Sequence, residues 1–187
     1  MWDFVNPTIM KTQTKALPKV LTFSEAKYYI FSVVFVGLAV ATPTIFHQFN
    51  LAGPRFLPMH IFVLLAGILF GWRTGLLVGL LSPLMSYSIT HMPPVAILPE
   101  TVLELGVYGL AIGLLREKNL NIWLSLVSAM VLGRLARLAF VLAFGLHTNF
   151  WQYLQISWPG ILLQLALIPT AIYLLQRFLF KKSETKI

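Results

Sequence analysis

Apolar residues dominate this chain in long runs that short polar stretches separate. Runs of this length and composition are typical of helices that cross a membrane. There are six of them, over residues 24–46, 58–71, 74–90, 100–115, 122–146 and 157–178. The pattern therefore predicts an all-α, polytopic integral membrane protein with six transmembrane helices. Residues 1–23 are expected to form a cytoplasmic lead-in, residues 24–179 the membrane domain, and residues 180–187 a basic cytoplasmic tail.

The second and third runs are short and interrupted. The second, from Pro58 to Gly71, would make about 21 Å of helix, which is too short to cross a bilayer upright. Ser82 and Pro83 interrupt the third run, and irregular loops, His47 to Leu57 and His91 to Pro99, flank the pair. Broken helices in membranes lie where backbone lines a cavity. This stretch is therefore predicted to enclose a small pocket.

Glycines recur at four-residue spacing in the second, third and fourth runs. Small residues at this spacing allow helix backbones to approach closely. They are Gly67, Gly71, Gly75 and Gly79, and then Gly109 and Gly113. The second and third helices are expected to form a tight pair.

Composition supports the membrane assignment. Hydrophobic residues make up 58% of the chain and charged residues only 11%, too few for the surface of a water-soluble domain. The net charge of +8 would suggest nucleic-acid binding in a soluble protein, but here it follows from topology and no nucleic-acid partner is expected. With both ends inside, eleven of the 14 Lys and Arg residues fall on the cytoplasmic side and only Arg55 outside. This bias predicts an N-in, C-in orientation in the bilayer.

The fourth and fifth predicted membrane helices contain four charged residues, and charge inside a membrane is costly and is usually paired or functional. Glu100 and Glu104 share one face of the fourth helix, and Arg134 and Arg137 share one face of the fifth. Two interpretations remain open. Glu104 and one arginine form an ion pair that locks the two helices, or at least one arginine contacts an anionic or hydrogen-bonding part of a ligand.

The four histidines all fall at the predicted outer face, two of them beside methionines. Their spacing matches no compact metal motif, but a metal-complex or haem site there is an alternative to simple ligand contact. Amide and aromatic residues crowd the same side and suit hydrogen bonding to, or stacking on, a polar heterocycle. The candidate ligand-binding residues are Asn50, Arg55, His60, Tyr87, His91, Glu100, Glu104, Arg134, Arg137, Asn149, Trp151 and Gln164.

Enzymatic and nucleotide-binding signatures are missing from the sequence. There is no cysteine, no Walker A pattern, no H-E-x-x-H and no G-x-S-x-G. No catalytic residue, metal or cofactor is therefore predicted. A small intramembrane enzyme using Glu100, Glu104 and a histidine, and a structural or assembly protein without a ligand, are the weaker alternatives to a solute-binding transporter subunit.

The sequence resembles the substrate-binding S components of energy-coupling factor (ECF) transporters. The resemblance rests on FLPMHIFVLLAGILFG, GLLVGLLSPLMS, MPPV followed by LELGVYGLAIGLL, and more loosely GRLAR. The chain departs from the family pattern at Phe62, where proline often stands, and at His91, where glycine does. Val33 replaces a small residue ahead of Gly37 and Ala41.

The resemblance implies a six-helix protein of a prokaryotic cell membrane. It would capture a vitamin or related micronutrient from outside, and the loop between the first two helices would cover the site. A T transmembrane subunit and two ATPase subunits, on other chains, would supply the energy. The residues expected to dock the T subunit are Gly37, Ala41, Gly67 and Gly71.

Overall fold

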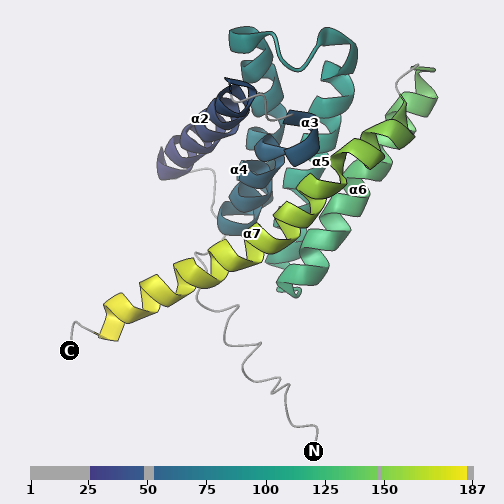
Figure 1. Ribbon diagram of the computed structural model, residues 1–187. Helices are drawn as coiled ribbons and strands as arrows, with labels where there is room; N and C mark the ends of the chain where they lie inside the picture. The colour runs from purple at the N-terminus through teal and green to yellow at the C-terminus, as the bar shows by residue number, and fades with distance from the viewer. Residues whose placement is uncertain (1–25, 49–52, 147–148, 185–187) are drawn as a thin grey trace, which may run out of the picture.

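A computed structural model describes residues 26–48, 53–146 and 149–184 of the chain. Throughout this part the chain is helical and contains no strand, which confirms the all-α prediction (Figure 1). The elements are α2 (Ala26–Gln48), α3 (Gly53–Phe56), α4 (Pro58–Thr90), the 3-10 turn η1 (Val95–Ile97), α5 (Leu98–Glu117), α6 (Ile122–Ala143) and α7 (Phe150–Glu184). The lead-in, residues 185–187 of the basic tail and Asn50 lie outside the described residues.

Helix α4 consists of two arms that fold back on each other at Gly71. This glycine has φ 82° and ψ −179°, a conformation that residues with a side chain rarely adopt. A Cβ added to Gly75 would lie 2.8 Å from the Cα of Gly67, whereas residues eight apart in a straight helix are about 12 Å apart. The chain therefore reverses at the position predicted to end the second helix, giving arms over residues 58–70 and 72–90.

The break predicted at Ser82 and Pro83 is wrong, because the second arm runs through both residues to Thr90 without leaving helical geometry. Proline has a backbone angle that suits a helix, and the hydrogen bond it removes is tolerated in membrane helices. The Ser82 hydroxyl donates to the Val78 carbonyl at 2.6 Å, within the same turns.

Helix α5 packs against both arms of α4 through glycines. A Cβ added to Gly109 would overlap the backbone of Gly75, and one added to Gly79 would overlap the carbonyl of Leu105. Gly113 lies in the same way against the backbone at Trp72. The predicted glycine pattern thus brings three helical segments into backbone contact, one more than the pair that was expected.

The remaining helices surround this centre. Phe31 of α2 stacks on Phe70 of α4, with ring centroids 4.7 Å apart. Gly133 allows α6 to approach α5 at Tyr108, and Gly160 of α7 lies against the backbone of α3. Figure 1 shows α7 crossing the other helices obliquely. It begins at Phe150, so residues 150–156, which precede the sixth predicted helix, are helical.

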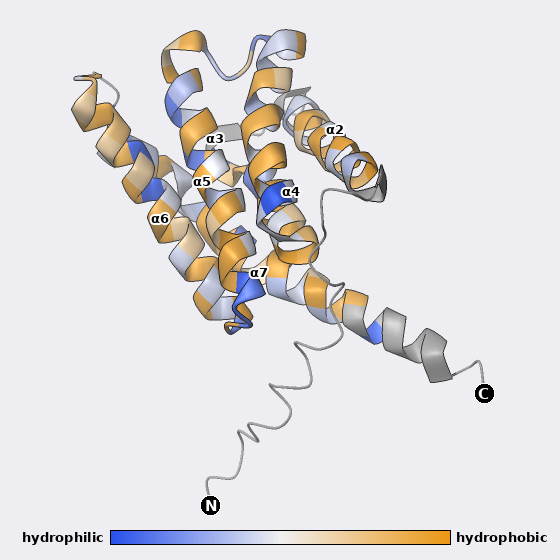
Figure 2. Ribbon diagram, turned by 180° about the vertical axis from the view of Figure 1, so that it is seen from behind, coloured by the Kyte–Doolittle hydropathy of each residue, from blue (hydrophilic) through white to orange (hydrophobic). Residues whose placement is uncertain are grey.

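Among the described residues, four helices are long and apolar enough by length and composition to cross a membrane, although one of them, Pro58–Thr90, folds into two arms at Gly71. A fifth apolar helix over Tyr29–Ile45 is shorter. The four are Pro58–Thr90, Val95–Glu117, Ile122–Ala143 and Phe150–Leu175. Figure 2 shows hydrophobic residues along all of them and hydrophilic ones confined to short stretches. Large apolar side chains such as Leu142 and Val33 are more than 70% exposed, which suits contact with lipid. The count of six crossings and the N-in, C-in orientation stay predictions.

Candidate functional site

Four charged residues, Glu100, Glu104, Arg134 and Arg137, meet between α5 and α6 and form what we call the charged cluster. Arg137 donates from Nη1 to Glu104 Oε2 at 2.9 Å and from Nη2 to Glu100 Oε1 at 2.5 Å. Arg134 Nε lies 3.2 Å from Glu104 Oε1. The predicted ion pair is therefore present, and it involves both arginines and both glutamates.

Local sequence explains how the four side chains come together. The glutamates are four residues apart on α5 and the arginines three apart on α6, so each pair projects from one face of its helix. A Cβ added to Gly133, next to Arg134, would overlap the Tyr108 ring and approach the Glu104 carbonyl. The glycine thus allows the two helices to approach closely where the charges meet.

Burial makes the pairing energetically important. Both glutamates are 0% exposed, Arg134 is 8% exposed and Arg137 is 5% exposed. A buried charge without a partner is strongly unfavourable, and more so in a bilayer. Each charged side chain of the cluster has an oppositely charged neighbour.

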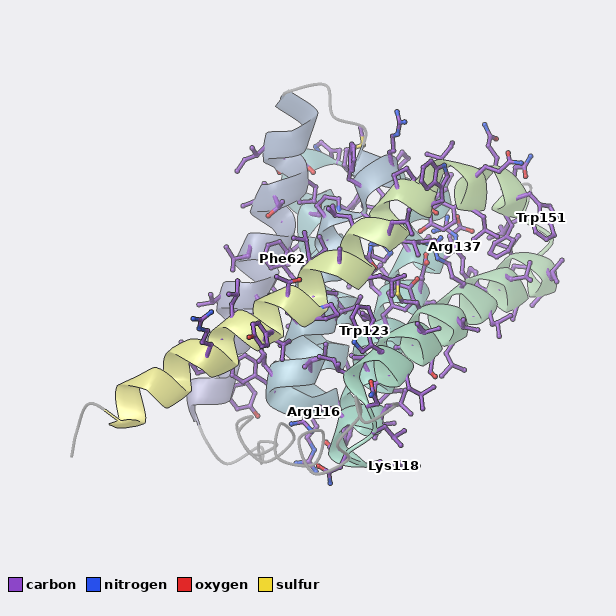
Figure 3. All side chains as sticks on the ribbon, turned by 60° about the horizontal axis from the view of Figure 1, so that its bottom comes forward. Phe62, Arg116, Lys118, Trp123, Arg137 and Trp151 are labelled. Atoms are coloured by element: carbon purple, nitrogen blue, oxygen red, sulfur yellow. The ribbon has the colours of Figure 1, made fainter. Side chains whose placement is uncertain are left out.

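Helix α7 supplies two further partners. Tyr153 donates its hydroxyl to Glu104 Oε2 at 3.0 Å, and its ring lies 3.7 Å from the Arg137 guanidinium carbon and 4.6 Å from that of Arg134. Ser157 Oγ accepts from Arg134 Nη1 at 3.1 Å. Figure 3 shows Arg137 in the space between α6 and α7. Helix α7 thereby joins the cluster to the rest of the bundle.

Sequence reasoning named neither Tyr153 nor Ser157 as a site residue. The two are four residues apart, which is the spacing of one helix face, but the sixth predicted helix begins only at Ser157. A helix start at Phe150 would have placed both on the side of α7 that faces the arginines. Tyr108, which was expected on the same face as the glutamates, accepts from Arg134 Nε at 3.0 Å.

His60, in the first turn of α4, borders the cluster. Its ring packs edge-on against Tyr108 with centroids 5.3 Å apart. Its Nε2 is 3.9 Å from Glu104 Oε1, which is too long for a hydrogen bond. Both ring nitrogens are buried and have no hydrogen-bond partner.

The buried side chains of Arg134, Gln164 and Ser125 also have polar atoms without a hydrogen-bond partner. Arg134 Nη2 has no partner, although Nε and Nη1 of the same residue are bonded. Gln164, 0% exposed on α7, has no partner at either its amide nitrogen or its amide oxygen. Leaving such groups unpaired away from water is costly, so they are positions where a ligand would gain most from binding.

The other candidate residues lie outside this constellation. Tyr87 and His91 pack edge-on at 5.9 Å at the end of α4, with His91 exposed. Arg55 is exposed on α3, and Asn149 caps α7 by accepting from the Gln152 amide. Trp151 is 73% exposed and extends from the start of α7 (Figure 3).

The alternative of a metal or haem site involves four histidines, of which His60 and His91 have described side chains. Within the described residues no group of three His, Asp or Glu side chains is placed to hold a metal ion. His147 lies outside the described residues, and nothing is described of the His47 side chain. His60 and His91 lie in different environments. His60 is 5% exposed, whereas His91 is exposed and follows the last residue of α4.

The four predicted docking residues fall into two kinds. Gly37 would place an added Cβ in open space, and Ala41 is exposed on the same helix. Gly67 instead packs against Ile112 and Gly109 of α5, and Gly71 forms the reversal of α4. The last two are therefore used inside the chain, and docking through Gly37 and Ala41 stays a prediction.

Comparison with known proteins adds one match. The family model described as "ECF transporter, substrate-specific component" matches residues 27–176. No curated protein and no solved structure matches the chain. The matched range includes the charged cluster, His60 and Gln164.

Proposed function

Because the chain belongs to the family of ECF transporter substrate-specific components, we propose that it captures a micronutrient, a vitamin or cofactor precursor, from outside a prokaryotic cell. Members of this family are transport subunits, so the chain is a substrate-specific subunit and not an enzyme. The proposal concerns the kind of substrate, the side from which it enters and the residues that hold it.

One observation supports the location of the site. The charged cluster, His60 and Gln164 bring unpaired hydrogen-bonding atoms into the buried part of a bundle whose outer surface is apolar. Binding sites of small polar molecules are mostly apolar enclosures with a few convergent polar groups. These groups lie towards the end of the bundle where α4 passes to α5 and α6 to α7, which the orientation rule predicts to be outside.

Mass spectrometry of the small molecule released from the purified full chain tests this site. We expect a near-stoichiometric ligand with the wild-type protein and at least about a tenfold loss of affinity in Arg134→Met, because a hydrogen bond to a charged donor is removed. Arg177→Met is the matched control, since Arg177 is exposed on α7 away from the cluster. Equal ligand retention by both variants would contradict the proposed site.

The energising partners form the second part of the proposal. The sequence has no Walker A motif, so ATP hydrolysis would come from two ATPase subunits coupled through an ECF T subunit. Uptake of the identified ligand should require co-expression of all three. Uptake that continues without any ATPase would contradict an ECF mechanism while leaving ligand binding intact.

A further inference from the structure

We infer that the ligand carries no net charge and presents a hydrogen-bond acceptor to Arg134 and an amide-like edge, with one donor and one acceptor, to Gln164. The inference rests on the proposed function, and it adds the chemical class of the substrate. Three features of the buried residues support it: the charge balance, the geometry of the arginines and the unpaired amide.

The charge balance comes first. The cluster contains two carboxylates and two guanidinium groups, and all four are engaged with one another. His60 is a further titratable side chain beside the cluster, with its Nε2 3.9 Å from Glu104 Oε1. A charged ligand would bring an additional charge to a buried cluster whose four charges already pair with one another, which is costly in a low-dielectric interior.

The arginines also lack the geometry that recognises anions. Carboxylates and phosphates are held best by two parallel N–H groups of one guanidinium. Arg137 already uses both Nη atoms on the glutamates, and the Tyr153 ring covers its face. Arg134 uses Nε on Tyr108 and Nη1 on Ser157, so only Nη2 is left. A single nitrogen can donate to a carbonyl oxygen or a ring nitrogen, but it cannot hold a carboxylate or phosphate through two parallel hydrogen bonds.

Gln164 indicates the second contact. Its side chain is fully buried, and neither of its amide atoms has a partner. It follows Ser157 by seven residues on the same face of α7, about 10 Å along the helix. An amide needs both a donor and an acceptor opposite it. A carboxylate would accept from its nitrogen but leave its oxygen unpaired, whereas an amide or lactam satisfies both.

The experiment compares neutral and anionic forms of the same heterocycle. Purified full chain, stripped of bound ligand, is titrated with nicotinamide and nicotinate, riboflavin and riboflavin 5′-phosphate, and pyridoxine and pyridoxine 5′-phosphate. The ligand released from freshly purified protein is identified in parallel. We expect a released ligand without net charge, and in any pair that binds a preference of at least about tenfold for the neutral member.

The outcomes separate the two levels of the proposal. A released ligand with net charge, or a tighter-binding anionic member, would overturn the charge inference and leave the proposed function standing. If no molecule is released and no member of any pair binds, the proposed function fails and the inference fails with it.

Two variants extend the test. Glu100→Gln leaves a surplus positive charge in the cluster and should raise affinity for the anionic member of a pair relative to wild type. Gln164→Leu should lower affinity for the neutral ligand about tenfold or more, because the ligand edge loses its partner. Leu167→Ala, at a 45% exposed position of α7, is the matched control and should bind like wild type.

The unfolding temperature of each variant distinguishes the loss of a ligand contact from the loss of the fold. The unfolding temperature of Gln164→Leu should not fall, since the unpaired amide has no hydrogen bond within the chain to lose. If Glu100→Gln does not fold, Gln164→Leu still decides the amide contact. Wild-type affinity in Gln164→Leu would overturn that contact.

Discussion

Arg137 is the arginine of the charged cluster that bonds both glutamates. It bonds one oxygen of each glutamate and lies on the Tyr153 ring, so it connects α5 and α6 to α7. Without Arg137, Arg134 would be the one positively charged side chain of the cluster beside two buried carboxylates. The residue therefore acts on stability first and on the ligand only through the arrangement it maintains.

The first prediction concerns this residue. Arg137→Met should lower the free energy of unfolding by about 3–5 kcal/mol, because breaking a buried pair strands its partners. Arg177→Met should change it by less than about 0.5 kcal/mol, as expected of an exposed site. Chemical unfolding of the full chain in detergent measures both. Equal effects would show that the cluster contributes no net stability.

A double-mutant cycle tests the pairing itself. Glu104→Gln combined with Arg137→Gln should cost less than the sum of the single changes, with a coupling of about 0.5–3 kcal/mol, because the two residues are bonded at 2.9 Å. Strict additivity would contradict a direct interaction. The same unfolding measurement is used, with Arg177→Gln replacing Arg137→Gln in the control cycle.

At the scale of elements, glycines decide which helices touch. The two arms of α4 and helix α5 meet at Gly67, Gly75 and Gly109, where backbone lies against backbone. Helix α2 has the opposite arrangement at Gly37, where nothing lies within 4 Å. Glycine thus allows close packing within the chain at Gly67, Gly75 and Gly109, whereas at Gly37 it lies on an open face of α2.

This contrast gives the next prediction. Gly109→Ala should destabilise the chain by about 1–3 kcal/mol or more, because the new methyl group overlaps the backbone of Gly75. Gly37→Ala should be neutral or stabilising by up to about 1 kcal/mol, since alanine favours helix. Thermal unfolding of the two variants side by side measures the difference, and similar melting temperatures would refute the close packing.

At the scale of the whole molecule, three basic residues of the described part, Arg73, Arg116 and Lys118, lie at the end of the bundle where α5 passes to α6. Arg116 and Lys118 lie together at this end of the bundle (Figure 3), and Val95 lies beyond the other end of α5. Arg73 follows the reversal of α4, whose Gly71 packs near Gly113 in the last turns of α5. This distribution is what a cytoplasmic end requires.

The chain has no cysteine, so single cysteines can test its orientation. Val95→Cys, at a 61% exposed position, should react with a membrane-impermeant maleimide in intact cells. Lys118→Cys should react only in inside-out vesicles, because α5 separates the two positions. The reverse pattern would invert the orientation, and reaction of both from one side would show that α5 does not cross.

Sequence alone determined the properties that depend on local pattern. Hydrophobic runs and scarce charge specified a helical membrane protein, and the end of the second run marked the reversal at Gly71. The i, i+4 and i, i+3 spacings placed Glu100 with Glu104 and Arg134 with Arg137. These inferences succeed because helix period and the cost of charge in lipid act within one segment.

Only the tertiary structure decided how the segments meet. It brought Tyr153 and Ser157 to the arginines, left Arg134 with one unpaired nitrogen, and buried Gln164 without a partner while exposing Trp151 on the same helix. It also separated Gly67, which packs against α5, from Gly37, which faces open space. The physical reason is that contacts between helices depend on rotation and approach of elements far apart in the chain, which no single segment encodes.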